Sequence, residues 1–102
     1  MKWEEILKAK ENSLFTSLRK EIKHLMNERE KIMALLNLPE KYQGRFTDNK
    51  IENLRKRLES LLDKLLENGL YFKSDKGKEF FDSETKKDLD KLIDTFRPRV
   101  DF

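Results

Sequence analysis

The chain has 102 residues, which suits one domain, and 42% of them are charged. It contains no cysteine, which excludes disulfide frameworks, thiolate metal sites and cysteine catalysis. The 23 basic and 20 acidic residues leave a formal net charge of +3, a small excess for a dedicated nucleic-acid-binding domain. Leucine occurs 16 times and valine once, so the composition favours helices over an extensive sheet.

The first predicted element is a short helix over residues 2–10. It places Trp3, Ile6 and Leu7 on one side. Asn12 and Ser13 suit a helix cap. A fresh helix therefore starts there, or the first helix continues with a kink.

Residues 13–37 show a clear helical period. Their apolar residues recur at three- and four-residue spacing: Phe15, Leu18, Ile22, Leu25, Ile32 and Leu36. Arg29 occupies the one position where this stripe lacks an apolar residue. Either its aliphatic stem lies along the core while its charge reaches water, or a carboxylate of a partner pairs with it.

A connection at residues 38–47 precedes the second long helix. The apolar stripe of that helix repeats in alternating steps of three and four residues: Ile51, Leu54, Leu58, Leu61 and Leu65. Thr47 or Asp48 suits the N-cap. With Thr47 as the cap, Phe46 and Ile51 have the spacing of a hydrophobic staple.

The second long helix is predicted to end at Asn68. Gly69 would take the left-handed conformation, and Leu70 would pack back on the helix in a Schellman closure. Residues 70–81 then carry two short aromatic runs around residues 74–77. This pattern predicts a small β-hairpin with Gly77 in its loop, and the alternative is an irregular aromatic loop that covers the end of the bundle.

A last helix is predicted over residues 83–96, capped by Asp82 or Ser83 and stopped by Pro98. The fold class is thus predominantly all-α, in a single domain over residues 1–102. We expect a small helical bundle of two long antiparallel helices plus a shorter C-terminal helix. A short N-terminal helix at residues 1–11 and an extended tail at residues 97–102 complete it.

The residues that carry chemistry form no catalytic or metal-binding constellation. His24 is the only histidine, so no thiol dyad or histidine-based metal site can be completed. The carboxylates near the C-terminus alternate with lysines, as on a solvated helix face. We therefore expect a protein that is not an enzyme and needs no cofactor. The sequence has no apolar run long enough to span a membrane and no signal-peptide pattern, so we expect it to be intracellular and soluble.

The preferred functional prediction is a protein–protein interaction or assembly module, a structural or accessory component of a larger complex. Its partner would be another protein or a second copy of the chain, with neither a membrane nor a small-molecule substrate involved. The predicted contact residues are Arg29, which interrupts the apolar stripe of the first long helix, and aromatic residues and arginines near the two ends of the chain. The terminal residues are Trp3, Arg97, Arg99 and Phe102.

The alternative prediction is nucleic-acid binding. The stretch LLDKLLENGLYFKSDKGKEFF, residues 61–81, resembles the second half of a winged-helix domain, in which a recognition helix runs into a charged β-wing. One unbroken helical pattern over residues 47–68 departs from that family. The basic residues that this prediction involves are Arg19, Lys20, Lys23, Arg55, Lys56, Lys73, Lys76 and Lys78.

Overall fold

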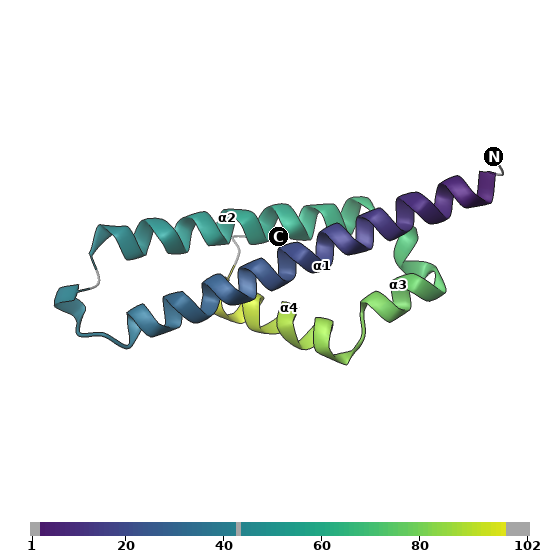
Figure 1. Cartoon of the computed structure of the whole chain (residues 1–102). Helices are drawn as coiled ribbons and strands as arrows, with labels where there is room; N and C mark the ends of the chain where they lie inside the picture. The colour runs from purple at the N-terminus through teal and green to yellow at the C-terminus, as the bar shows by residue number, and fades with distance from the viewer. Residues whose placement is uncertain (1–2, 43, 98–102) are drawn as a thin grey trace.

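The computed structural model describes residues 3–42 and 44–97, without the side chains of residues 4, 7 and 45. The described residues form four α-helices, α1 (Trp3–Leu36), α2 (Arg45–Glu67), α3 (Asp75–Phe80) and α4 (Ser83–Phe96), and two 3-10 turns, η1 (Glu40–Tyr42) and η2 (Tyr71–Lys73). They contain no strand, which confirms the predominantly all-α fold class. Figure 1 shows α1 and α2 as a long antiparallel pair, with α4 packed along α1.

Helix α1 is continuous from Trp3 to Leu36. The first predicted helix therefore continues into the second, and no fresh helix starts at Asn12 or Ser13. The separate helix predicted for residues 1–11 is absent, and Asn12 and Ser13 lie within α1 and do not cap it. No glycine or proline interrupts residues 3–36, so the backbone has no reason to break there. The first turns of α1 project beyond the C-terminal end of α2 (Figure 1).

The hydrophobic core lies where α1, α2 and α4 meet. It contains most of the predicted stripe residues of the two long helices: Phe15, Leu18, Ile22, Leu25, Ile32, Leu54, Leu58 and Leu61. Leu89, Leu92 and Phe96 of α4 complete it, whereas the predicted stripe residue Leu36 is 41% exposed and lies outside the core. Phe80 of α3 joins them and is fully buried. Because α1, α2 and α4 each carry one apolar face, the three faces can pack together and form a core within one chain.

The start of α2 needs correction, and so does the closure predicted after its end at Asn68. The helix begins at Arg45 with Gly44 as its N-cap, so Thr47 lies inside its first turn, where its backbone N–H donates to the Gly44 carbonyl. Phe46 is 72% exposed, so it makes no staple on Ile51.

At the C-terminal end, Asn68 caps α2, and its side-chain amide donates to the Lys64 carbonyl at 2.8 Å. No described glycine has a positive φ, so Gly69 forms no left-handed closure. Leu70 is 83% exposed and does not pack back on the helix.

The β-hairpin predicted for residues 70–81 is wrong, because this stretch folds into η2 and α3. The Ser74 hydroxyl accepts a hydrogen bond from the Gly77 backbone N–H and caps α3. The rings of Phe72, Phe80 and Phe81 then gather beside Phe15 of α1, with centroids 4.8 to 5.9 Å apart. A short helix turns these aromatic residues toward one another, whereas the alternation of a strand would place them on opposite faces.

Helix α4 is confirmed as predicted, with the Asp82 carboxylate accepting from the Thr85 backbone N–H at 2.8 Å. Two arginines hold its C-terminal end. Arg29 Nε donates to Thr95 Oγ1 and Arg55 Nε donates to the Phe96 carbonyl, both at 2.7 Å. In the described chain Arg29 thus has a hydroxyl partner on α4. The predicted Pro98 stop and the tail beyond Arg97 lie outside the described residues.

Candidate functional site

Acidic residues are scarce in the middle of α1, after Glu4 and Glu5 of its first turn. Between residues 6 and 27 there are two, Glu11 and Glu21, against five lysines and arginines. Both carboxylates are turned toward neighbouring elements. Glu21 receives two hydrogen bonds from Arg57 of α2, each 3.0 Å long, and raises the pKa of Arg57. Glu11 accepts a hydrogen bond from the Ser74 hydroxyl.

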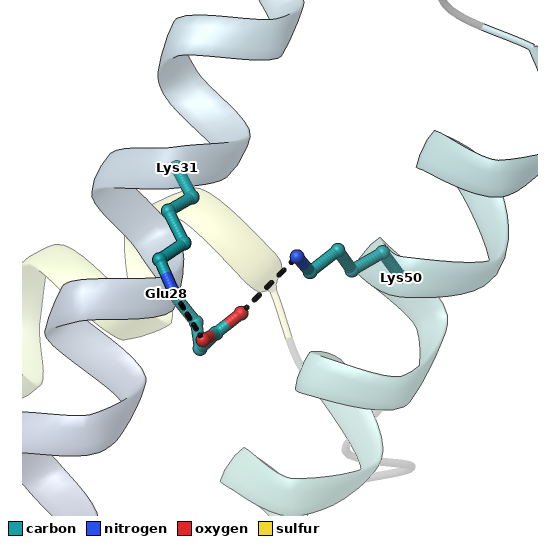
Figure 2. Close-up of polar contacts among 3 residues, drawn as sticks. All are labelled: Glu28, Lys31 and Lys50. Carbon is teal, nitrogen blue, oxygen red and sulfur yellow. Dashed lines mark hydrogen bonds and ion pairs between the residues drawn. The ribbon is translucent and has the colours of Figure 1, made fainter.

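Glu28 continues this pattern near the other end of the bundle. Figure 2 shows its carboxylate between Lys31 of the same helix and Lys50 of α2, at 3.2 and 3.4 Å. The hydrogen bond from Lys31, and a second one from Lys50, lower the pKa of Glu28. The carboxylates of Glu21 and Glu28 thus pair with basic side chains of α2 and not with Arg19, Lys20 or Lys23 of α1.

Three of these basic side chains line a hollow of about 440 Å³ between α1 and the N-terminal end of α4, which we name the α1–α4 cavity. Its volume is in the usual range for small-molecule sites. Its α1 wall consists of Thr16, Arg19, Lys20, Ile22 and Lys23, and its α4 wall of Asp82, Glu84, Thr85 and Asp88.

The charges of the α1–α4 cavity are arranged in two facing groups. Arg19 lies over the Phe80 ring, 5.8 Å from its centroid, which holds the guanidinium at the cavity edge. The backbone N–H of Thr85 lowers the pKa of Asp82, with smaller contributions from the Thr85 hydroxyl and the charge of Arg19. Cations from one helix thus face carboxylates and hydroxyls from the other, an arrangement that can bind a ligand with both acceptor and donor groups.

A shallow groove on α1 continues from this cavity. We name it the α1 groove; it encloses about 390 Å³ and is lined by Asn12, Ser13, Thr16, Ser17 and Lys20. Thr16 and Lys20 belong to both hollows, so the cationic cavity and the hydroxyl-lined groove form one continuous polar surface.

The residues predicted to bind nucleic acid are separated by the fold. Arg19, Lys20 and Lys23 come together in the α1–α4 cavity, whereas Arg55 is used to hold Phe96 and pairs with Glu52. Lys56 is exposed on α2.

The lysines predicted for the hairpin lie on η2 and α3. Lys76 donates to Asn12 at 2.5 Å, while Lys73 and Lys78 are exposed. The described chain therefore contains no β-wing, and the winged-helix resemblance is not borne out.

The predicted protein-contact residues do not form one surface either. Trp3 is 72% exposed at the start of α1, Arg97 is the exposed C-cap of α4, and Arg29 bonds to Thr95. Arg99 and Phe102 lie outside the described residues. Sequence reasoning missed Thr16 and Thr85, because a hydroxyl on a helix face carries no signal until a second helix is placed opposite it.

Within residues 3–42 and 44–97, no group of three or more acidic or histidine side chains could hold a metal ion. His24 is exposed and lines none of the hollows described above. No helix of the described chain has the length and apolar content needed to cross a membrane.

Comparison with protein families identifies a match over most of the chain. Residues 9–84, which are 76 of the 102, match the model of the PX domain. Over this stretch the described residues are helical apart from short connections. Searches of curated proteins and of solved structures found no match.

PX domains are non-catalytic modules that bind phosphoinositide lipids at membranes. The expectation that the partner is neither a membrane nor a small molecule is therefore wrong. The coarser expectation of a non-catalytic interaction module agrees with the match, whereas nucleic-acid binding gains no support from it. Because the matched stretch covers three quarters of the sequence, this helical chain belongs to the PX domain family.

Proposed function

We propose that the protein binds the headgroup of a phosphoinositide lipid in the α1–α4 cavity. The observation that carries the proposal is the facing arrangement of Arg19, Lys20 and Lys23 on α1 with carboxylates and a hydroxyl at the start of α4. The family membership supplies the ligand class, and the cavity supplies a place for it that is open to the surface.

The mixture of charges in the cavity suits an inositol phosphate. Phosphate oxygens accept hydrogen bonds and carry negative charge, so they would contact Arg19, Lys20 and Lys23. Ring hydroxyls can donate as well as accept, so they would contact carboxylates such as Glu84 and Asp88. A polyol phosphate can therefore contact both walls of the cavity, whereas inorganic phosphate would contact the basic α1 wall alone.

The same mixture disfavours a nucleic-acid backbone. A phosphodiester backbone presents repeated negative charges, and the three carboxylates of the α4 wall would repel it. The predicted assembly role in a larger complex stays a prediction, because the contact residues proposed for it are spread over both ends of the bundle.

The test is binding to phosphatidylcholine vesicles with and without a phosphatidylinositol phosphate, followed by sedimentation. Each lysine near a lipid surface contributes about 1 kcal/mol, so Lys20→Ala with Lys23→Ala is expected to weaken binding about 30-fold. Lys56→Ala with Lys73→Ala is the matched control, because it also removes two charges and both lysines are exposed outside the cavity. Soluble inositol phosphate should compete.

Two results would contradict the proposal. One is equal binding to both kinds of vesicle. The other is an equal loss in the control and in the double variant, which would indicate a general response to net charge and no defined site.

A further inference from the structure

The end of the bundle at which α1 passes into α2 exposes several large apolar side chains. They lie in the last turn of α1, the connection and the first turn of α2, and we name them the apolar tip: Met33, Leu36, Leu38, Tyr42 and Phe46. Tyr42 is 63% exposed and Phe46 is 72% exposed. Figure 1 shows this end as the turn of the long helical pair, opposite to the start of α1.

The apolar tip is separate from the core and from the α1–α4 cavity. None of its residues belongs to the buried core, and the cavity is lined by residues 16–23 and 82–88. Each ring of the tip has a lysine over it. Lys41 Nζ lies 4.9 Å from the centroid of Tyr42, and Lys50 Nζ, which also pairs with Glu28, lies 5.8 Å from that of Phe46. Exposed apolar patches of this kind mark interaction surfaces.

The exposed area of the apolar tip suits a weak dimer. An aromatic side chain buries about 150–250 Å² in a core, so Tyr42 and Phe46 expose roughly 100–180 Å² each. With its aliphatic side chains, the tip exposes roughly 300–500 Å² of apolar surface. Two copies in contact would bury roughly 600–1,000 Å², to which a polar rim adds. Specific interfaces begin at about 1,200 Å², so we expect a dissociation constant on the order of 100 µM.

Charged side chains of both signs surround the apolar tip. Carboxylates and lysines alternate along residues 30–50: Glu30, Lys31, Glu40, Lys41, Asp48 and Lys50. A rim of one sign would repel a second copy, whereas a rim of both signs can pair with itself across a two-fold axis. The negative surface of an acidic bilayer would repel these carboxylates. The rim therefore favours a second copy over a membrane.

We infer that the apolar tip is a self-association surface, on which a second copy of this chain packs end to end about a two-fold axis. The rings of Tyr42 and Phe46 form the centre of the contact, and the charged rim of each copy faces that of the other. Self-association at the tip does not depend on what the α1–α4 cavity binds, because the two surfaces share no residue.

The experiment measures the oligomeric state of the full chain by sedimentation velocity between about 10 µM and 1 mM, a range that spans the expected dissociation constant. The sedimentation coefficient should rise with concentration from the value of a monomer toward that of a dimer. Amide NMR of the unmodified chain over the same range locates the contact. Its concentration-dependent shifts should be confined to residues 33–50.

Tyr42→Ser with Phe46→Ser is the test variant. It should weaken dimerisation about 30-fold or more, because aromatic side chains at the centre of an interface carry most of its binding energy. Both rings are exposed, so the variant should keep its fold, which circular dichroism checks. Trp3→Ser with Leu70→Ser is the matched control, because these side chains are 72% and 83% exposed and lie outside the tip.

Four results would overturn the inference. They are a wild-type chain that stays monomeric, an equal loss in the control, concentration-dependent shifts outside residues 33–50, and binding to plain phosphatidylcholine vesicles that requires Tyr42 and Phe46 without any dimer. The last result would assign the tip to a bilayer. If the dimer forms while phosphoinositide binding fails, the proposed function is wrong and self-association stands.

Discussion

Replacing Gly77 by alanine tests the packing of α3 against η2. A Cβ atom built at Gly77 would lie 2.4 Å from Phe72 Cα, 2.5 Å from the Tyr71 carbonyl oxygen and 2.7 Å from the Phe72 carbonyl carbon. All three are backbone atoms, so no side chain can rotate away. The two segments must separate, and the aromatic cluster around buried Phe80 must loosen with them.

Two opposing contributions decide whether Gly77→Ala raises or lowers the free energy of unfolding. Alanine in a helix is favoured over glycine by about 1 kcal/mol, so Gly77→Ala would be stabilising if the site were open. Overpacking typically costs about 1–3 kcal/mol, and a contact with backbone atoms lies toward the upper end of that range. We therefore expect a net loss of about 1–2 kcal/mol in the free energy of unfolding, or a lowering of Tm by roughly 4–16 °C.

Thermal and urea unfolding followed by circular dichroism measure this loss. Gly69→Ala is the control, because its Cβ would lie 3.4 Å from the Leu66 carbonyl oxygen, an ordinary contact. It should be neutral or slightly stabilising. A Gly77→Ala protein as stable as the wild type, or more stable, would refute the close approach of α3 to η2.

Three further predictions concern the core, the cap of α4 and the histidine. Leu61→Ala should lower the free energy of unfolding by about 2–5 kcal/mol, because Leu61 is 1% exposed. A loss under about 0.5 kcal/mol in urea unfolding would mean that the apolar stripe of α2 is not buried. The lowered pKa of Asp82 means that its ionised form stabilises the fold. This contribution to stability is present above the ordinary pKa of 3.8 and is lost as the pH falls below that value. Asparagine can cap the helix but does not titrate. The stability of Asp82→Asn should therefore depend less on pH in this acidic range. His24→Ala should leave vesicle binding at neutral pH unchanged, since His24 is exposed and lines neither the α1–α4 cavity nor the α1 groove; a loss of binding without unfolding would contradict this.

Long amphipathic segments were predictable because their signal repeats. Phe15, Leu18, Ile22 and Leu25 are four successive members of one stripe, and all four are buried in the core. An error at one position cannot erase such a pattern. The Asp82 cap of α4 was also predictable, because an N-cap depends on a side chain and the backbone a few residues away.

Short segments and helix ends failed for the opposite reason. Gly69 and Gly77 carry signals for left-handed backbone, yet neither has a positive φ. The conformation of residues 70–81 is set by Phe15, more than 50 residues away in the sequence, whose ring gathers Phe72 and Phe80. A local rule for hairpin loops has no access to that contact.

The candidate site was predictable in part. Arg19, Lys20 and Lys23 were recognised as a cluster, because residues three and four apart are neighbours on a helix. The sequence did not predict that Thr85 and the carboxylates at the start of α4 face them across a cavity.

The residues alone predict that the chain is helical, that its long helices each bury one face, and that Arg19, Lys20 and Lys23 cluster on the first long helix. Helical periodicity and the spacing of charges along one helix are local properties, so they can be counted from the residues alone. Only the packing of the helices shows which carboxylates lie near that charge: Glu21 pairs with Arg57 of α2, while Arg19, Lys20 and Lys23 face the carboxylates at the start of α4. The physical reason is that an electrostatic partner is defined by distance in space, and two helices bring together residues that the sequence keeps far apart.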